Sequence, residues 1–512
     1  MDDPVAIGTG GVSRLDVGAV ARDGRPVVIE PAALDAVRRS HRTATGLIAG
    51  DRAVYGLSTG FGALADRYIE PGSRAALQVG LVRSHAATVG PEVAPEVVRA
   101  MMLLRAATLA KGFSGIRTEL VTGLVALLNH GIVPIVREYG SLGCSGDLAP
   151  LAHVALALIG EGEVLDDRGH RTSAATALSV AGLSPLILEA KEGLALTNGT
   201  DGMLGMLILA CTDVARLLKT ADVAAAMSVE ALEGTDQAFR PELVALRPHP
   251  GQAASAANMM ALLAGSGVVA SHKVDDNRVQ DAYSLRCAPQ VLGAVRDTLE
   301  HAEVVVDREL ASAIDNPVVL PNGLVASCGN FHGAPLAYAA DFLAIALADA
   351  ASMSERRVDR HLDPARSHGL PAFLAANPGV DSGLMLAQYT AAALVAEGRR
   401  LAAPASVDNI PTSAMQEDHV SMGWAAAGKL RQVVENFARV LAIEVMTSCR
   451  ALELRSPHQP APATRAVLEG VRQQVAGVGP DRYLAPEVDL MTGMVASGRI
   501  LAWAESVTGP LR

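Results

Sequence analysis

Residues 140–153 are Gly-Ser-Leu-Gly-Cys-Ser-Gly-Asp-Leu-Ala-Pro-Leu-Ala-His, and the tripeptide at their centre has an unusual chemical capacity. If the amide nitrogen of Gly146 reaches the carbonyl carbon of Cys144, ring closure and loss of the Ser145 hydroxyl leave an electron-poor methylidene-imidazolone. Glycine at 143 and 146 favours the tight turn that this closure needs, because a β-carbon would obstruct the close approach. The stretch therefore carries a candidate electrophile made from backbone.

The same stretch also suits an ordinary turn that leads into a helix, with Asp147 as N-cap and Pro150 in the first turn. The full fourteen residues, however, resemble the cofactor loop of the histidine and aromatic amino acid ammonia-lyases, in which such a tripeptide cyclises. The resemblance implies that Cys144-Ser145-Gly146 forms 4-methylidene-imidazol-5-one autocatalytically, with no external cofactor. Cysteine is an accepted variant of the usual alanine at the first position. Asp147 is then a candidate for local proton handling.

Composition favours a large helical protein. The chain has 512 residues, of which 50% are hydrophobic and only 3% aromatic, so it can bury a large core. Few aromatics and many Ala and Leu residues favour close-packed helices over a β-sandwich. The net charge of −11, without a run of Lys or Arg, argues against binding to nucleic acid or an anionic membrane. A small soluble substrate fits better.

Cysteine usage and the terminus point to the cytoplasm. The five cysteines are scattered and odd in number, which predicts neither a disulfide framework nor a metal site: Cys144, Cys211, Cys287, Cys328 and Cys449. The chain begins Met-Asp-Asp and lacks the pattern of a signal peptide. The apolar runs 202–219 and 334–350 contain aspartates, so we expect buried bundle helices there and not membrane spans.

Helical patterns dominate after a mixed first segment. Residues 1 to about 75 combine short Val-rich stretches with Gly and Pro, which indicates a few strands and helices. Long helices are predicted beyond residue 93, at 94–111, 116–129, 203–219, 288–314, 334–358, 382–402 and 424–455. Loops are predicted at 247–251, 316–333, 369–379 and 404–411. We therefore expect a mainly α fold, with a mixed N-terminal region (1–200) carrying the cofactor loop and a long-helix bundle (201–512). By resemblance this is the ammonia-lyase and fumarase-like architecture.

Tyr55 begins the glycine-rich string Tyr-Gly-Leu-Ser-Thr-Gly-Phe-Gly at residues 55–62. In isolation this tyrosine suits a loop aromatic that packs over the core. The string resembles the family loop whose tyrosine is the catalytic base. Because the proton on the β-carbon of an amino acid is barely acidic, that role requires a tyrosine pKa lowered from about 10.

Two further strings resemble family segments that surround the cofactor and substrate. Asn198 follows Lys-Glu-Gly-Leu-Ala-Leu-Thr and could simply cap the next helix, but by resemblance it supports the cofactor and the substrate amine. The string 280–286 contains Gln280, Tyr283 and Arg286, the last two on one helical face. Arg286 offers a planar fork suited to the substrate carboxylate, with a surface ion pair as its ordinary alternative. Gln280 and Tyr283 are implied supports, and Tyr283 is placed among the catalytic residues.

Substrate choice depends on two other positions. His85 and Glu417 resemble the pair that holds an imidazole in family members acting on histidine, whereas relatives acting on phenylalanine or tyrosine carry other residues there. A carboxylate and an imidazole complement a ring with one donor and one acceptor nitrogen, and they would be left unpaired beside a phenyl ring. Glu417 is also counted as catalytic. Phe331 is expected against cofactor or substrate, with a core position equally favoured.

The resemblance implies non-oxidative deamination of L-histidine to trans-urocanate and ammonia, the first step of histidine degradation. Whether the substrate amine or its imidazole meets the electrophile stays open. The family's site is built from several chains, which implies a homotetramer. Gly80 and Phe113 depart from the residues of many relatives and bear on affinity more than on reaction type.

Other functions remain open. An aromatic amino acid ammonia-lyase or a 2,3-aminomutase would share every cofactor motif. His85 and Glu417 argue against these functions, but an aminomutase acting on histidine could keep both residues. A catalytically silent helical homologue would keep Cys144-Ser145-Gly146 uncyclised. A fumarase-like lyase would also be a long-helix tetramer, but the chain lacks a string resembling its Gly-Ser-Ser loop.

Overall fold

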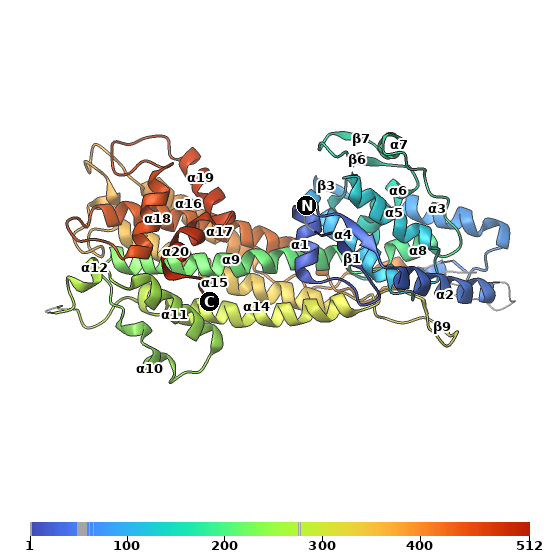
Figure 1. The fold of residues 1–512 in the computed structure, drawn as a ribbon, viewed down its shortest axis with the longest axis horizontal. Helices are drawn as coiled ribbons and strands as arrows, with labels where there is room; N and C mark the ends of the chain where they lie inside the picture. The colour runs from blue at the N-terminus through green and yellow to red at the C-terminus, as the bar shows by residue number, and fades with distance from the viewer. Residues whose placement is uncertain (1–2, 49–58, 61, 65, 275, 277) are drawn as a thin grey trace. The chain divides into compact units, whose positions relative to one another are not determined.

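The computed structural model describes residues 3–48, 59–60, 62–64, 66–274, 276 and 278–512 (Figure 1). The chain packs as two compact units, neither of which is continuous in sequence. The first unit contains residues 1–209, 303–341 and 404–428. The second contains residues 210–302, 342–403 and 429–512.

The first unit begins with the mixed structure that the sequence predicts. Strand β1 (Val5–Ile7) pairs in parallel with β2 (Val27–Ile29), and helix α1 (Arg14–Arg22) connects them. Ser13 caps α1 in a reciprocal arrangement with Asp16, which satisfies backbone N–H groups at the helix start. Helix α2 (Pro31–Ile48) follows.

Buried helices form the centre of the first unit. Helix α4 (Pro95–Ala110) is buried on almost every side and packs against α1 and α5 (Thr118–Asn129). Helix α6 (Leu148–Leu158) packs against α3 (Arg74–His85) and α8 (Glu192–Thr197). Both α4 and α5 lie where the apolar periodicity predicts them.

Short strands cover the helices of this unit without forming a large sheet. Strand β3 (Val89–Glu92) pairs with β5 (Arg137–Tyr139), and β6 (Glu163–Leu165) lies between β4 (Val133–Pro134) and β7 (Arg171–Ser173), all antiparallel. Helix α7 (Ala174–Val180) follows β7. The predicted loop 316–333 contains a small hairpin of β8 (Val318–Val319) and β9 (Val325–Ala326).

Four helices of more than twenty residues confirm the mainly α fold: α9 (Asp201–Ala231), α14 (Ala288–Ala311), α15 (Ala334–Leu362) and α17 (Gly423–Glu453). The prediction that α9 ends at Lys219 is wrong. Helix α9 continues because buried polar residues beyond that point find partners: Asp222 accepts hydrogen bonds from Ser255 and Asn258, and Glu230 from Ser266.

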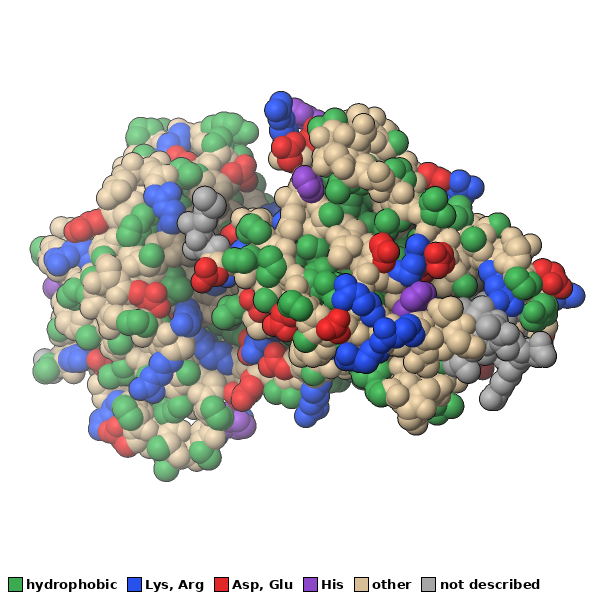
Figure 2. All heavy atoms as spheres, turned by 45° about the vertical axis from the view of Figure 1, so that its right-hand side comes forward, with side chains coloured by type: hydrophobic (Ala, Val, Ile, Leu, Met, Phe, Trp, Pro, Cys, Tyr) green, Lys and Arg blue, Asp and Glu red, His purple; other side chains and the backbone are tan. Residues whose placement is uncertain are grey.

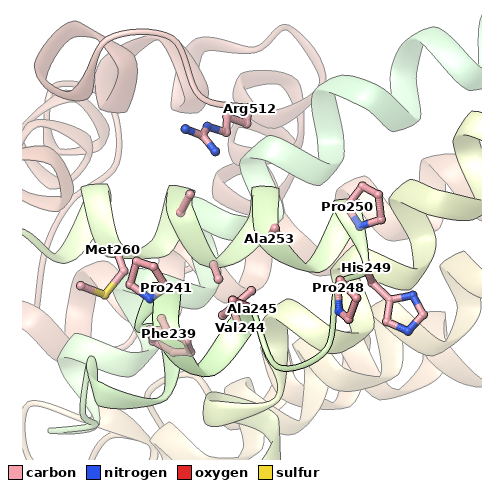
Figure 3. A pocket seen from close by; sticks show the side chains of 12 residues that line it. Phe239, Pro241, Val244, Ala245, Pro248, His249, Pro250, Ala253, Met260 and Arg512 are labelled. Atoms are coloured by element: carbon pink, nitrogen blue, oxygen red, sulfur yellow. The ribbon is translucent and has the colours of Figure 1, made fainter.

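The second unit adds shorter helices around its parts of these long ones. They are α10 (Pro241–Val244), α11 (Pro250–Leu263), α12 (Gly267–Ala270), α13 (Tyr283–Arg286), α16 (Met385–Leu401), α18 (Pro462–Arg472), α19 (Ala485–Ala496) and α20 (Arg499–Thr508). A cavity of about 690 Å³ lies beside α10 and α11, with Phe239, Val244 and Met260 among its apolar lining residues (Figure 3). It contains none of the predicted site residues.

Among the residues that the structure describes, α15 is long and apolar enough to cross a membrane by length and composition. Its most apolar window is 61% buried, as in the core helix of a folded bundle. On the molecular face of Figure 2, basic side chains are interspersed with acidic ones and do not gather into one basic surface.

Candidate functional site

The turn that carries the candidate electrophile requires glycine at two positions. Gly143 and Gly146 have φ of +66° and +74°, in the left-handed region that favours glycine. A β-carbon added to Gly146 would lie 2.1 Å from the carbonyl oxygen of Gly199, and one added to Gly143 would lie 2.3 Å from Ser421 Oγ. Glycine is therefore needed at both positions, as the sequence predicts, and the groups that a β-carbon would displace belong to Gly199 and Ser421.

Hydrogen bonds from residues 421–422 hold the start of this turn. Ser421 donates its hydroxyl to the Gly143 carbonyl at 2.7 Å, and the Met422 N–H donates to the Leu142 carbonyl at 2.8 Å. Ser141 donates from Oγ to Asp147 Oδ1 at 3.0 Å across the turn. Ser421 is not predicted from the sequence, although it lies in the same short string as Glu417.

Asp147 links the turn to a helix that begins far along the chain. Asp147 is the N-cap residue of α6, as the alternative predicts, but its side chain makes no capping bond to that helix. Oδ2 instead accepts the N–H groups of Gly202 and Met203 at 2.9 and 2.8 Å, at the start of α9, while the Asp147 N–H donates to the Gly199 carbonyl at 2.7 Å. Burial raises the pKa of Asp147 to about 7, against the opposing effect of these donors.

Asn198 lies at the end of α8 with its side chain turned away from helix capping. Nδ2 donates to the Asn316 carbonyl at 3.0 Å, and Oδ1 is buried without a partner among the described residues. The Asn198 carbonyl accepts from Arg105 Nη1 at 2.9 Å. A buried amide oxygen without a partner is costly, and such an atom marks a place where a ligand group can bind.

Two buried ion pairs lie near Asn198, and the sequence does not predict them. Arg105 is fully buried and pairs with Asp201 at 3.1 Å, and Lys191 pairs with Asp315 at 2.5 Å with both side chains almost fully buried. Asp315 precedes Asn316, so the second pair holds the segment that binds the Asn198 amide. In the sequence, each of these four residues looks like an ordinary surface charge.

Glu417 lies against the candidate tripeptide. Ser145 Oγ donates to Glu417 Oε1 at 3.2 Å, and Thr412 Oγ1 donates to Oε2 at 3.0 Å. Between these two residues, the turn Ser413–Met415 has positive φ at all three positions. This backbone conformation is strained for residues other than glycine. Burial and the Glu417 carboxylate raise the pKa of the Cys144 thiol to about 12, so this thiol stays protonated.

His85 ends helix α3 and lies within electrostatic reach of Glu417. Its Nδ1 lies 3.1 Å from Ser84 Oγ. Burial lowers the pKa of His85 below its ordinary value of 6.5, and this outweighs the raising effect of the Glu417 carboxylate. His85 is therefore a neutral imidazole near pH 7, with one donor and one acceptor nitrogen.

Gln280, Tyr283 and Arg286 belong to the second unit. Tyr283 and Arg286 share the single turn α13, as their spacing predicts, and the guanidinium carbon lies 4.6 Å from the centroid of the Tyr283 ring. Arg286 Nε donates to the Asp281 carbonyl at 2.9 Å. Gln280 is exposed and Tyr283 is 70% exposed. Exposed side chains of this kind are available to bind a partner or substrate.

The remaining predictions fall on residues with less specific surroundings. Phe331 is half-buried just before α15, and its neighbour His332 stacks on His419 with ring centroids 5.6 Å apart. Phe113 and His332 are among the residues lining a cavity of about 640 Å³ in the first unit. At Gly80, a β-carbon would meet no other described residue within 4 Å. The smaller residue at 80 therefore leaves open space without altering a packed contact.

Tyr55 lies outside the described residues. Only the end of its loop is described, where a β-carbon on Gly62 would lie 2.8 Å from Ser413 Oγ, beside the turn that precedes Glu417. Across the described part of the chain, no group of three or more His, Cys, Asp or Glu side chains could hold a metal ion.

Known proteins match this chain over nearly its whole length. A family model described as aromatic amino acid lyase matches residues 12–473. The chain is 58% identical to the histidine ammonia-lyase of Streptomyces coelicolor, over 99% of each chain. Among solved structures, tyrosine aminomutase from Streptomyces globisporus matches with a TM-score of 0.94, 38% identity and full coverage of both chains. Histidine ammonia-lyase from Trypanosoma cruzi matches with a TM-score of 0.90 and 37% identity, covering 99% of this chain and 96% of that one.

Proposed function

The chain belongs to the aromatic amino acid lyase family, and we propose that it deaminates L-histidine without oxidation to trans-urocanate and ammonia. The observation that carries the proposal is the position of Glu417, a carboxylate beside the candidate tripeptide and within electrostatic reach of the neutral imidazole of His85. The 58% identity to a histidine ammonia-lyase over the whole chain supports the same substrate. The proposed reaction makes the protein a carbon–nitrogen lyase.

Residues 144–146 fit the self-made cofactor of the family. The turn has positive φ at Gly146 and no room for a β-carbon there, as expected where backbone atoms must approach closely. The buried Asn198 Oδ1, which has no partner among the described residues, offers an acceptor to the ring or the substrate amine. Formed from Cys144-Ser145-Gly146, 4-methylidene-imidazol-5-one would supply an electron-poor carbon that makes the substrate amine a better leaving group. The proposal requires no external cofactor.

His85 and Glu417 orient the substrate imidazole in this proposal. Glu417 accepts a hydrogen bond from the ring N–H, and the neutral His85 can pair with the other ring nitrogen. A phenyl ring in the same position would leave both groups without partners, which costs on the order of 1–3 kcal/mol for each buried polar group. The pair therefore discriminates against phenylalanine. Phe331 would pack against substrate or cofactor.

Arg286 binds the substrate carboxylate, with Gln280 and Tyr283 in support. The fork of an arginine suits a planar carboxylate, and the adjacent Tyr283 ring limits the orientations of the guanidinium. We propose that the working site combines residues of several copies in a homotetramer, and the exposure of Tyr283 and Gln280 supports this. Tyr55 would remove the β-proton of the substrate.

The partner required for activity is thus a small molecule and further copies of the chain, with neither nucleic acid nor membrane. We expect the enzyme to act in the cytoplasm.

Product absorbance tests the proposal directly. Purified protein is mixed separately with L-histidine, L-phenylalanine and L-tyrosine, and the ultraviolet absorbance of the conjugated acrylate is followed. Urocanate from histidine alone is expected. Formation of cinnamate or coumarate would support the ammonia-lyase reaction but overturn the roles of His85 and Glu417.

Because an aminomutase is among the similar solved structures, the lyase product must be distinguished from a mutase product. An aminomutase would return the amino group to the β-carbon, so the histidine reaction should also be analysed by chromatography for β-histidine. Accumulation of β-histidine in place of urocanate would favour the mutase. Absence of any product from all three amino acids would favour a silent homologue.

A further inference from the structure

The turn α13 carries Arg286 on only four residues, so something else must fix its position. A single helical turn is not stable on its own in water. The Arg286 side chain donates one described hydrogen bond to backbone, from Nε to the Asp281 carbonyl. The Asp281 side chain is held in turn by the Thr235 N–H at 2.7 Å. These contacts hold the residues just before the turn.

A buried arginine binds the turn itself. Arg357 of α15 is 1% exposed at its side chain and donates from Nη1 to the Ser284 carbonyl at 3.2 Å. Ser284 lies between Tyr283 and Arg286 in the sequence. The core of the second unit therefore contacts the backbone of the turn at its centre.

Glu444 of α17 fixes the direction of the Arg357 guanidinium. The two side chains form a bidentate pair, with Nε to Oε1 at 2.5 Å and Nη2 to Oε2 at 2.8 Å. Such a pair has little rotational freedom because two parallel bonds define the plane of the fork. The remaining nitrogen, Nη1, is consequently aimed at Ser284.

Two serines complete the arrangement around the carboxylate. Ser228 of α9 donates to Glu444 Oε1 at 2.7 Å, and Ser354 of α15 donates to Oε2 at 2.5 Å. The pair is therefore fully hydrogen-bonded within the bundle, as a buried charge pair must be to be tolerated. Helices α9, α15 and α17 thus contribute to one hydrogen-bond network, which reaches the backbone of α13 through Arg357.

We propose that Arg357 and Glu444 are positioning residues for substrate carboxylate binding, acting through the backbone of α13 on Arg286. Neither touches the substrate. The inference rests on the proposed function, because it assumes that Arg286 binds the carboxylate of L-histidine. Because the fork must meet both oxygens of the carboxylate, a displaced turn weakens substrate binding, so the support of the turn affects KM directly.

The test replaces the whole pair, since removing one partner would leave an unpaired buried charge. The double variant Arg357→Met with Glu444→Leu removes the contact to Ser284 with side chains of similar volume. The second variant, Arg357→Lys, keeps the charge and loses the fork. For both we expect KM for L-histidine to rise about 10-fold or more, with kcat changed less than about 3-fold.

Inhibitor binding gives a measurement that a general loss of stability would not reproduce. Urocanate has both imidazole and carboxylate, whereas histamine has the imidazole and amine without a carboxylate. The inhibition constant of urocanate should rise by about the same factor as KM, and that of histamine should stay within about 2-fold of wild type. Intact mass should still show loss of two water molecules, because the tripeptide is untouched.

A matched control comes from the buried pair Asp222 and Arg296, whose side chains are 2.7 Å apart in the same unit. Asp222 accepts from Ser255 and Asn258 and has no described contact with α13. The double variant Asp222→Leu with Arg296→Met removes an equivalent buried pair.

If the Arg357 variants and this control give the same KM and the same urocanate inhibition, the positioning role is overturned while the proposed function stands. If wild-type protein produces no urocanate from L-histidine, the proposed function fails and this inference fails with it.

Discussion

Ser145 donates a hydrogen bond from its hydroxyl to the carboxylate of Glu417 at 3.2 Å, although 272 positions separate the two residues in sequence. One is the residue whose hydroxyl must be lost to form the cofactor, and the other is the proposed partner of the substrate imidazole. Their contact places the proposed electrophile and the proposed substrate pocket together in the first unit. Chemistry at the cofactor and choice of substrate can therefore be tested separately by substitutions on the two sides of this contact.

Ser145→Ala should abolish turnover, because the methylidene carbon comes from the serine side chain. Wild-type protein should be lighter than its sequence mass by two water molecules, and the variant should have its full sequence mass. Intact-mass spectrometry and urocanate absorbance check this together, with the exposed Ser506→Ala as control. Retained activity in Ser145→Ala would sink the cofactor proposal.

Gly146→Ala should block cyclisation while the chain still folds. The added β-carbon would meet the Gly199 carbonyl at 2.1 Å, in addition to the strain of positive φ. Gly182→Ala is the matched control, since Gly182 has φ of +70° and a β-carbon there would have nothing within 4 Å. The unfolding free energy of both variants should fall by about 1–2 kcal/mol because of the backbone strain. Only Gly146→Ala should keep the full sequence mass, without the loss of two water molecules. Equal mass loss in the two would show that the Gly199 contact is unimportant.

Glu417→Gln should lower the turnover of L-histidine by about 100-fold or more, because an amide is a much weaker acceptor for the imidazole N–H than a carboxylate. The thermal midpoint should shift by only a few degrees. Steady-state rates and thermal unfolding measure the two effects, and Asp418→Asn next to it in the chain is the control. An unchanged rate would mean that the imidazole is bound elsewhere.

His361→Gln should make the protein more resistant to acid. Nδ1 of His361 lies 2.7 Å from the Arg357 carbonyl and must be the donor, while Nε2 is buried without a described partner. Burial lowers the pKa of His361 to about 4 from its ordinary value of 6.5. The unfolded chain binds this proton first as pH falls, so wild type loses stability below about pH 6.5, by roughly 3 kcal/mol at pH 4.

Urea unfolding of wild type and His361→Gln at pH 7.5 and pH 5 measures this difference. Between pH 7.5 and pH 5, the unfolding free energy of wild type should fall more than that of His361→Gln. The exposed His458→Gln should show no such change. If the unfolding free energy of His361→Gln changes between the two pH values as much as that of wild type, His361 does not titrate as its burial requires.

The sequence predicts this fold well where the signal is local. Apolar periodicity places α4, α5, α14 and α16 within a few residues of their observed bounds. It misplaces the end of α9, because Asp222 and Glu230 look like surface residues until their partners on other helices are known. The end of α9 is therefore set by tertiary contacts and not by local helix propensity.

The candidate site divides in the same way. The short strings around Cys144, Asn198 and Glu417 identify residues that the structure brings into one unit, while Tyr55 stays a prediction outside the described residues. The sequence offers Asp147 as the N-cap of the helix that follows it, and the residue does lie there. Its side chain, however, accepts hydrogen bonds at the start of α9, which follows from how two loops dock and is not visible in the sequence.

That docking has a consequence for when the protein becomes reactive. The turn at 143–146 is shaped by Ser421, Gly199 and the start of α9, which come from distant parts of the chain. An unfolded or half-folded chain has none of these constraints, so its tripeptide is an ordinary, inert peptide. If residues 144–146 cyclise as proposed, the reaction becomes a check on folding: only a correctly assembled core can form the electrophile, and misfolded copies carry none that could react with other molecules in the cell.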